Sequence, residues 1–214
     1  YSMQLAFAPL VAALAAGCRV MIKPSEFTPR TSALIKSTLA ELFSEDHVAV
    51  IEGGPEEASA FTALPFDHLF YTGSTQVGRL VAKAAAENLV PVTLELGGKS
   101  PAIVTPDYPR DSAAKSIAWG KFFNAGQTCV APDYVMTPKG SETAMGEAIV
   151  SAVQHQFPDA STDDAYTAIV SDRHYERLNG MIEEARKGGA TVLQPEHDAQ
   201  AAQAARKIPP TVLI

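Results

Sequence analysis

Cys129 lies at the centre of the stretch whose residue types point most directly to chemistry, F-F-N-A-G-Q-T-C-V-A-P at residues 122–132. Gly126, Gln127 and Thr128 precede it, and small or polar neighbours of this kind keep a thiol accessible. The thiolate is the nucleophilic form, and a turn that brings backbone N–H groups near the sulfur favours it. The stretch therefore predicts a nucleophilic cysteine. The alternative is a small buried hydrophobic residue, which is a common setting for a free cysteine.

Glu95 is the candidate general base, because it ends an apolar strand in the stretch E-L-G-G-K-S-P at residues 95–101. A carboxylate in that place is expected to be partly desolvated, which suits a general base. A base and a nucleophilic thiol in one chain form the pairing that covalent catalysis uses. The alternative is an exposed glutamate paired with Lys99, and spacing alone does not show whether Glu95 and Cys129 meet.

Gly73 and Ser74 form a candidate phosphate-binding turn in G-S-T-Q-V-G, between an expected strand and an expected helix. Helix N-termini carry unpaired N–H groups and the positive end of the helix dipole, so a phosphate fits there. Gly73 permits close approach of a ligand and the Ser74 hydroxyl can donate a hydrogen bond. The stretch is neither the G-x-G-x-x-G fingerprint nor a Walker motif, and the alternative is an ordinary capped turn.

Lys23 and Glu26 directly follow a short apolar strand, in K-P-S-E. Ligands of open parallel sheets bind at the carboxyl ends of the strands. A carboxylate there can accept hydrogen bonds from ribose hydroxyls, and a lysine can reach a ribose oxygen or a phosphate. The alternative is a solvated loop in which Ser25 caps the next helix.

Composition excludes several classes of partner. The 214 residues carry a net charge of −7 without a Lys/Arg-rich run, which argues against nucleic acid and anionic membranes as partners. The two cysteines, Cys18 and Cys129, form no disulfide framework, so a cytoplasmic location is expected. The five histidines show no metal-ligand spacing, so no metal site is expected.

Short strands alternate with helices along the chain, which predicts an α/β fold with a parallel, doubly wound sheet. We expect a boundary near Gly97 and Gly98. The apolar segment 5–16 is too short to span a bilayer and predicts a buried helix that Pro9 breaks or kinks. The expected strands are residues 19–23, 48–51, 68–71, 92–96, 102–104, 133–136, 191–193 and 211–214, and the expected helices are 28–43, 56–63, 76–87, 111–123, 141–156 and 172–187.

Three motifs together resemble the NAD(P)-dependent aldehyde dehydrogenase superfamily: F-Y-T-G-S-T-Q-V-G at 70–78, T-L-E-L-G-G-K-S-P at 93–101 and N-A-G-Q-T-C at 124–129. The resemblance covers nearly the whole chain. Within the superfamily, A-G-Q-T-C-V-A-P-D-Y at 125–134 looks most like the class 3 branch, and closest to coniferyl aldehyde dehydrogenases.

The resemblance implies a role for each matching residue. Cys129 would attack the aldehyde carbonyl to form a thiohemiacetal, which loses hydride to the nicotinamide and becomes a thioester. Glu95 would activate the water that hydrolyses the thioester, and the Cys129 backbone N–H would help hold the oxyanion. The cofactor-binding residues would be Lys23, Glu26, Gly73, Ser74 and Gly98, with Lys23 and Glu26 at the adenosine ribose, Ser74 at the pyrophosphate and Gly98 near the nicotinamide.

The resemblance also implies how the chain is organised. Residues 1–98 would be the C-terminal part of a Rossmann-like NAD(P)-binding domain, and residues 99–214 the N-terminal part of the catalytic domain, both incomplete. The implied cofactor is NAD, with NADP as the alternative. The substrate would be an aldehyde, with an aromatic, coniferyl-type compound as the finer expectation, and the full-length protein would be a homodimer.

Departures from the family pattern leave two other readings open. The family's oxyanion-hole asparagine would precede Tyr1 and its second ribose-binding glutamate would follow Ile214, so the 214-residue chain is expected to be a segment with weak or no activity. The alternatives are a catalytically impaired nucleotide-binding module and a CoA-acylating dehydrogenase, although the latter generally lacks the base that Glu95 supplies. Cys18, in an apolar context, is interpreted as structural.

Overall fold

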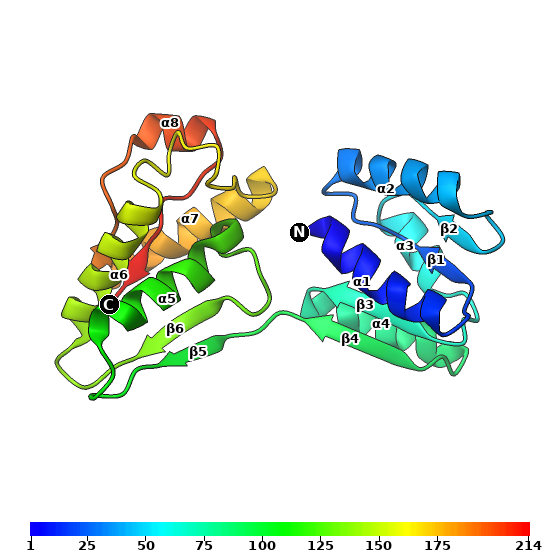
Figure 1. Ribbon diagram of the computed structural model, residues 1–214, viewed down its shortest axis with the longest axis horizontal. Coiled ribbons are helices and arrows are strands. Elements are labelled where there is room, and N and C mark those ends of the chain that lie inside the picture. Colours follow the sequence, from blue (N-terminus) through cyan, green and yellow to red (C-terminus); the bar gives the residue numbers. More distant parts are fainter. The chain divides into compact units, whose positions relative to one another are not determined.

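The chain divides into two units, Tyr1–Gly97 and Gly98–Ile214, and the computed structural model describes all of residues 1–214 (Figure 1). Helices and short strands alternate in the first unit, as the sequence pattern predicts. Its elements are α1 (Ser2–Ala15), β1 (Val20–Ile22), α2 (Pro29–Leu42), β2 (Val48–Val50), α3 (Pro55–Thr62), β3 (Leu69–Gly73), α4 (Thr75–Glu87) and β4 (Val92–Leu96).

The second unit begins with another strand–helix–strand segment and continues with helices. A short 3-10 helix, η1, follows α5 and leads into the stretch that contains Cys129. The elements are β5 (Ser100–Ile103), α5 (Arg110–Phe122), η1 (Phe123–Gly126), β6 (Pro132–Met136), α6 (Glu142–Gln156), α7 (Asp172–Lys187), β7 (Val192–Leu193), α8 (Ala199–Ala204) and β8 (Val212–Leu213).

Three of the four strand pairs are parallel: β1 with β2, β3 with β4, and β5 with β6. A helix connects the two strands of each parallel pair, as parallel strands require a crossover. The prediction of an α/β fold with parallel strands is confirmed. The strands form two-stranded sheets, and the last pair, β7 with β8, is antiparallel.

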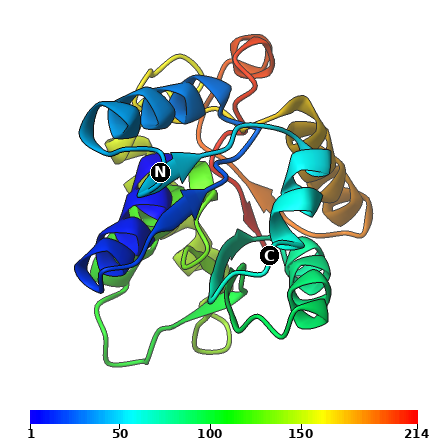
Figure 2. The same ribbon diagram turned by 90° about the vertical axis from the view of Figure 1, so that its right-hand side faces the viewer.

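Apolar side chains on one face of each helix form separate cores in the two units. In the first unit, α1 and α2 lie beside the β1–β2 pair, with Leu10, Ile35 and Val48 in the core (Figures 1 and 2). A second cluster joins α4 to β3 through Leu69 and Val81. In the second unit, the core lies mainly between α5 and α6.

The N-terminal helix differs from the expectation in two ways. α1 continues through Pro9, so of the two effects expected of this proline, a break or a kink, the break is wrong. Proline removes one helical hydrogen bond, and the packing of Phe7, Leu10 and Leu14 against the α2 core offsets that loss. The helix is also less buried than predicted, because only Leu10 is buried and Val11 is 65% exposed.

Gly78 permits close packing of α4 against β4. It is buried, and a Cβ at this position would come within 2.8 Å of Leu96 Cδ2. We expect Gly78→Val to lower the free energy of unfolding by about 1–3 kcal/mol, because the larger side chain overpacks this contact. Urea denaturation of the 214-residue chain measures the change.

The control for this prediction is Ala86→Val, at an exposed position of the same helix. It introduces the same side chain without overpacking, so only the helix propensity changes, by less than about 0.7 kcal/mol. If the two variants were equally stable, the contact between Gly78 and Leu96 would not restrict the size of the side chain.

Candidate active site

Cys129 follows a turn with an uncommon backbone conformation at the C-terminal end of α5. Asn124, Ala125 and Gly126 have positive φ values of 54°, 52° and 75°. The next turn is closed by a hydrogen bond of 3.1 Å from the Ala131 N–H to the Thr128 carbonyl. Cys129 is partly buried and forms no disulfide, so the structure places its thiol in a defined turn rather than deep in a core.

Gly98 lies beside the backbone of Cys129. A Cβ on Gly98 would be 3.7 Å from the Cys129 carbonyl oxygen, which is ordinary van der Waals contact. The structure therefore brings together Cys129 and the glycine for which the family resemblance implies a place near the nicotinamide.

Charged side chains surround the Asp133 carboxylate, close to the cysteine turn. Lys99 lies 3.1 Å and Lys121 3.8 Å from it. Burial lowers the pKa of Lys121, while Asp133 opposes this shift and Lys99 adds to it. Lys99 therefore pairs with Asp133 and not with Glu95, the partner that the alternative interpretation of the sequence suggests.

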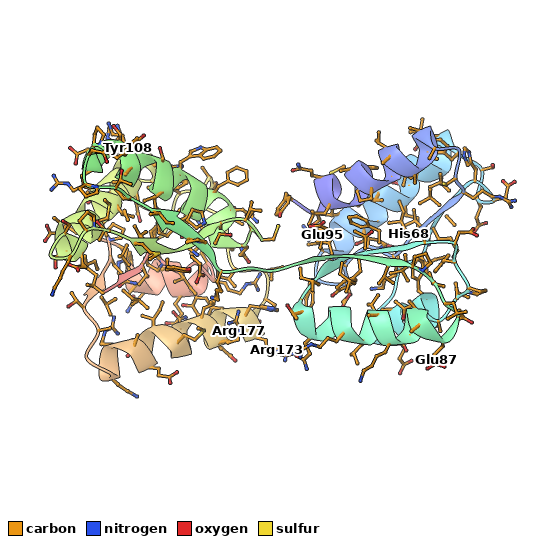
Figure 3. All side chains as sticks on the ribbon, turned by 90° about the horizontal axis from the view of Figure 1, so that it is seen from below. His68, Glu87, Glu95, Tyr108, Arg173 and Arg177 are labelled. Atoms are coloured by element: carbon orange, nitrogen blue, oxygen red, sulfur yellow. The ribbon has the colours of Figure 1, made fainter.

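Glu95 lies on β4, opposite Thr72 of β3, and Figure 3 shows it toward the end of this strand pair that lies away from His68. Its side chain is exposed, whereas those of its strand neighbours Leu94 and Leu96 are half-buried. The expectation of a partly desolvated carboxylate is therefore wrong for the described chain. Alternation along the strand explains the difference, since successive side chains point to opposite faces.

Lys23 and Glu26 form an ion pair just beyond the carboxyl end of β1. Lys23 Nζ lies 3.0 Å from Glu26 Oε2, and the Lys23 side chain is only 10% exposed. A hydrogen bond from its own backbone is the main cause that lowers the pKa of Glu26, with desolvation opposing and the Lys23 ammonium assisting. The pair therefore presents a charged carboxylate just beyond the carboxyl end of β1.

Ser74 lies between β3 and α4, where it caps the helix. Its Oγ accepts a hydrogen bond of 3.3 Å from the Val77 N–H. Gly73 is the last residue of β3 and Thr75 the first of α4, so only Ser74 of the predicted turn lies between the two elements. Ser74 and Gly73 thus stand at the N-terminus of a 13-residue helix, where the backbone favours an anion.

Tyr71 lies beside the candidate phosphate-binding turn, and the sequence analysis does not single it out. A Cβ on Gly73 would overlap the Tyr71 hydroxyl, so the phenol ring crosses Gly73 only because this residue has no side chain. Burial raises the pKa of Tyr71, hydrogen bonds from Ser74 oppose the rise, and the charge of Glu26 adds to it. The structure therefore brings the Tyr71 hydroxyl next to Ser74, within the field of the Glu26 charge. The available signal was the spacing of two residues, which puts Tyr71 and Gly73 on the same strand face.

Cys18, the second thiol, does not have the apolar setting that the sequence suggested. It is exposed, in the loop that follows α1. Gly17 has a φ of 80° and ends the helix in the left-handed conformation. The expected apolar setting of Cys18 is therefore wrong.

Two further observations concern the chain as a whole. No helix combines the length and the apolar composition that crossing a bilayer requires. No group of three or more histidine, cysteine, aspartate or glutamate side chains could hold a metal ion.

The chain belongs to the aldehyde dehydrogenase family, which it matches over residues 1–214. It is 49% identical over 216 residues to a probable coniferyl aldehyde dehydrogenase of Caulobacter vibrioides and 50% identical over 214 residues to one of Pseudomonas aeruginosa. Both similarities cover 100% of this chain and 44% of the relative. A dimeric NADP-preferring aldehyde dehydrogenase of Rattus norvegicus is 38% identical, over 100% of this chain and 46% of its own.

Solved aldehyde dehydrogenase structures share the fold. Substrate-bound Staphylococcus aureus AldH aligns with a TM-score of 0.88 at 40% identity, covering 100% of this chain and 45% of its own. A Mycobacterium tuberculosis aldehyde dehydrogenase complexed with NAD+ aligns with a TM-score of 0.87 at 31% identity, covering 99% and 45%. The chain therefore spans less than half the length of these relatives.

Proposed function

We propose that this chain supplies the nucleophile, the general base and part of the cofactor site of an enzyme that oxidises an aldehyde to a carboxylic acid. The observation that carries the proposal is the setting of Cys129. It lies in a structured turn beside Gly98, within a chain that matches the aldehyde dehydrogenase family along its whole length.

In the proposed reaction, the Cys129 sulfur attacks the carbonyl carbon of the aldehyde. An S–C bond forms, and the Cys129 backbone N–H stabilises the negative charge that develops on the oxygen. A nicotinamide held at this site would supply the acceptor for the hydride that this carbon loses. Glu95 then takes a proton from a water molecule, whose oxygen attacks the resulting thioester. The S–C bond breaks, the acid leaves and the thiol is restored.

The residues at the ends of β1 and β3 fit a dinucleotide. Lys23 and Glu26 offer a cation and a carboxylate for ribose oxygens, and Ser74 with the α4 N-terminus offers donors for a pyrophosphate. The Mycobacterium tuberculosis structure is a complex with NAD+, which supports this assignment. We assign residues 1–98 to nucleotide binding and residues 99–214 to catalysis on the same grounds.

NAD is the proposed cofactor, with some tolerance of NADP. The Glu26 carboxylate suits two ribose hydroxyls and repels a 2′-phosphate. The relative from Rattus norvegicus is described as NADP-preferring, which supports tolerance of the second cofactor.

We expect Glu26→Gln to shift the ratio of NADP affinity to NAD affinity by roughly 10-fold toward NADP, because it removes one like-charge repulsion near a phosphate. Calorimetric titration of the 214-residue chain with each cofactor measures the two affinities. Glu56→Gln is the control for net charge, because it removes the charge of an exposed carboxylate in the first turn of α3. If the ratio of NADP affinity to NAD affinity were the same in both variants, Glu26 would not contact the ribose.

The names of the relatives support two finer proposals, about substrate and assembly. Their names as coniferyl aldehyde dehydrogenases support an aromatic aldehyde as substrate, and the dimeric relative supports a homodimer for the full-length protein. A cytoplasmic location is proposed because the two cysteines form no disulfide.

The function is tested by following NADH absorbance with cinnamaldehyde-type and benzaldehyde-type substrates, with and without CoA. The assay uses an enzyme of full family length that carries these residues, and the 214-residue chain beside it. We expect the carboxylic acid as product from the full-length enzyme. An acyl-CoA product would instead identify a CoA-acylating enzyme, and NAD binding without turnover would identify a nucleotide-binding module.

A further inference from the structure

The Gln127 side chain spans two segments that lie far apart in the sequence. Its Nε2 donates to the Asn124 carbonyl at 3.2 Å and to the Ala168 carbonyl at 3.1 Å. Its Oε1 accepts from the Val170 N–H at 2.9 Å. Both donor hydrogens and the acceptor of the amide are therefore used, two of them across more than forty residues of sequence.

The segment that Gln127 binds is itself fixed from a third part of the chain. The Ile169 N–H donates to the Arg206 carbonyl at 2.9 Å, and Arg206 Nε donates back to the Ile169 carbonyl at 2.6 Å. Arg206 also pairs with Asp172, the first residue of α7, at 3.1 Å. Gln127 is thus anchored to a segment that is held in place by other contacts.

The turn before Cys129 needs such an anchor. A left-handed backbone costs about 1–2 kcal/mol for an ordinary L-residue, although asparagine and glycine tolerate it better. Ala125 has no such tolerance, and it lies between Asn124 and Gly126 in the same conformation. Asn124 Nδ2 donates to the Gln127 carbonyl at 3.1 Å, so Asn124 and Gln127 close the turn from both ends.

We infer that Gln127 is a positioning residue for Cys129. Its amide holds the left-handed turn against residues 168–170, which fixes the backbone N–H of Cys129 relative to its thiol. The inference rests on the proposed role of Cys129 as nucleophile. In this inference, the geometry of the nucleophile depends on the contacts of Gln127 with Ala168 and Val170, which are 41 and 43 residues away along the chain.

Two reactions of the same thiol separate positioning from simple exposure. In alkylation by iodoacetamide, the sulfur displaces iodide from a methylene carbon and needs only an accessible thiolate. In acylation by 4-nitrophenyl acetate, an S–C bond forms at the carbonyl carbon, the C–O bond to 4-nitrophenolate breaks and the thiol proton passes to solvent. Acylation passes through an oxyanion and therefore depends on an aligned N–H donor.

The experiment measures both rates at Cys129 by peptide mass spectrometry in the 214-residue chain, with the exposed Cys18 as internal reference. We expect Gln127→Ala to slow acylation of Cys129 by about 10-fold or more, because misplacement of a reacting group has effects of this size. Alkylation of Cys129 should change by less than about threefold, since thiolate access persists.

Gln127→Glu is the second variant, because it keeps the side-chain shape and the acceptor for Val170 but removes both donors. It should reproduce the loss of acylation. Gln154→Ala, at an exposed position of α6 in the same unit, is the matched control and should change neither rate. Hydrogen exchange of the Val170 N–H in the unsubstituted chain tests the clamp without any substitution, and it should be slow.

The outcomes distinguish the inference from the proposed function. If the unsubstituted chain showed no preferential acylation of Cys129 over Cys18, the role of Cys129 as nucleophile would fail and the inference with it. If acylation were preferential but unchanged in both Gln127 variants, only the role of Gln127 would fail. Equal changes in acylation and alkylation, or rapid exchange of the Val170 N–H, would also overturn it.

Discussion

Replacing Cys129 with alanine in an enzyme of full family length is expected to abolish aldehyde oxidation. The value of kcat/KM should fall by about 10⁴-fold or more, because the covalent intermediate cannot form without the nucleophile. Binding of NAD should be unchanged, since the proposed ribose and phosphate contacts come from Lys23, Glu26 and Ser74. Steady-state NADH formation and a separate titration with NAD measure the two quantities.

Cys18→Ala is the control for this experiment, because Cys18 is the other cysteine of the chain and is exposed. It removes a thiol without touching the turn that follows η1, so activity should remain at the unsubstituted level. If Cys129→Ala retained aldehyde oxidation, or if both variants lost it equally, Cys129 would not be the nucleophile.

Glu95→Gln is expected to block the second half of the reaction more than the first. A general base typically contributes about 10²–10⁴-fold to the step that it assists. Thioester hydrolysis should slow by that factor while hydride transfer continues, so a burst of NADH appears without steady turnover. Stopped-flow absorbance records the burst, and intact-protein mass spectrometry detects the acylated Cys129.

The matched control is Glu87→Gln at the C-terminal end of α4, in the same unit as Glu95 (Figure 3). It removes one carboxylate next to the negative end of a helix dipole, so it should leave both the burst and the turnover unchanged. If Glu95→Gln eliminated the burst as well, Glu95 would act before deacylation, for example on the thiol itself.

The exposure of Glu95 bears directly on this prediction. An exposed carboxylate is solvated and meets water readily, whereas a base needs an ordered water near the thioester. Glu95 is exposed at its position on β4. Slower thioester hydrolysis in Glu95→Gln would show that this carboxylate activates the water despite its exposure.

Local signals in the sequence were sufficient for most of the secondary structure. The predicted strand at 92–96 and the predicted helix at 172–187 agree with β4 and α7 to the residue. Both are bounded by residues with strong local preferences, such as Ser171 as N-cap and Gly188 at the C-terminal end of α7. Capping and glycine conformations depend on neighbouring residues, so they can be read from the sequence.

Exposure was harder to predict, because it depends on what packs against each element. The sequence suggests an apolar setting for Cys18 and a buried helix at residues 5–16, but Cys18 is exposed and Leu10 is the one buried side chain of α1. Glu95 shows the same limit, since the apolar run around it did not show which face of β4 is covered. Apolar composition shows that a segment can be buried, but it does not show which of its side chains are buried.

The sequence by itself determined the chemistry that this protein carries: a thiol in a Gly-Gln-Thr turn, a strand-end carboxylate, and polar residues after two strands. Tertiary structure alone decided how these groups are held. It placed Lys99 on Asp133 and the Gln127 amide on the backbone of residues 168–170. Such contacts join residues across strands or across dozens of positions, and they form only when the surrounding apolar core fixes the elements that carry them. Residue spacing records local geometry, whereas the packing of distant segments depends on the whole set of buried side chains.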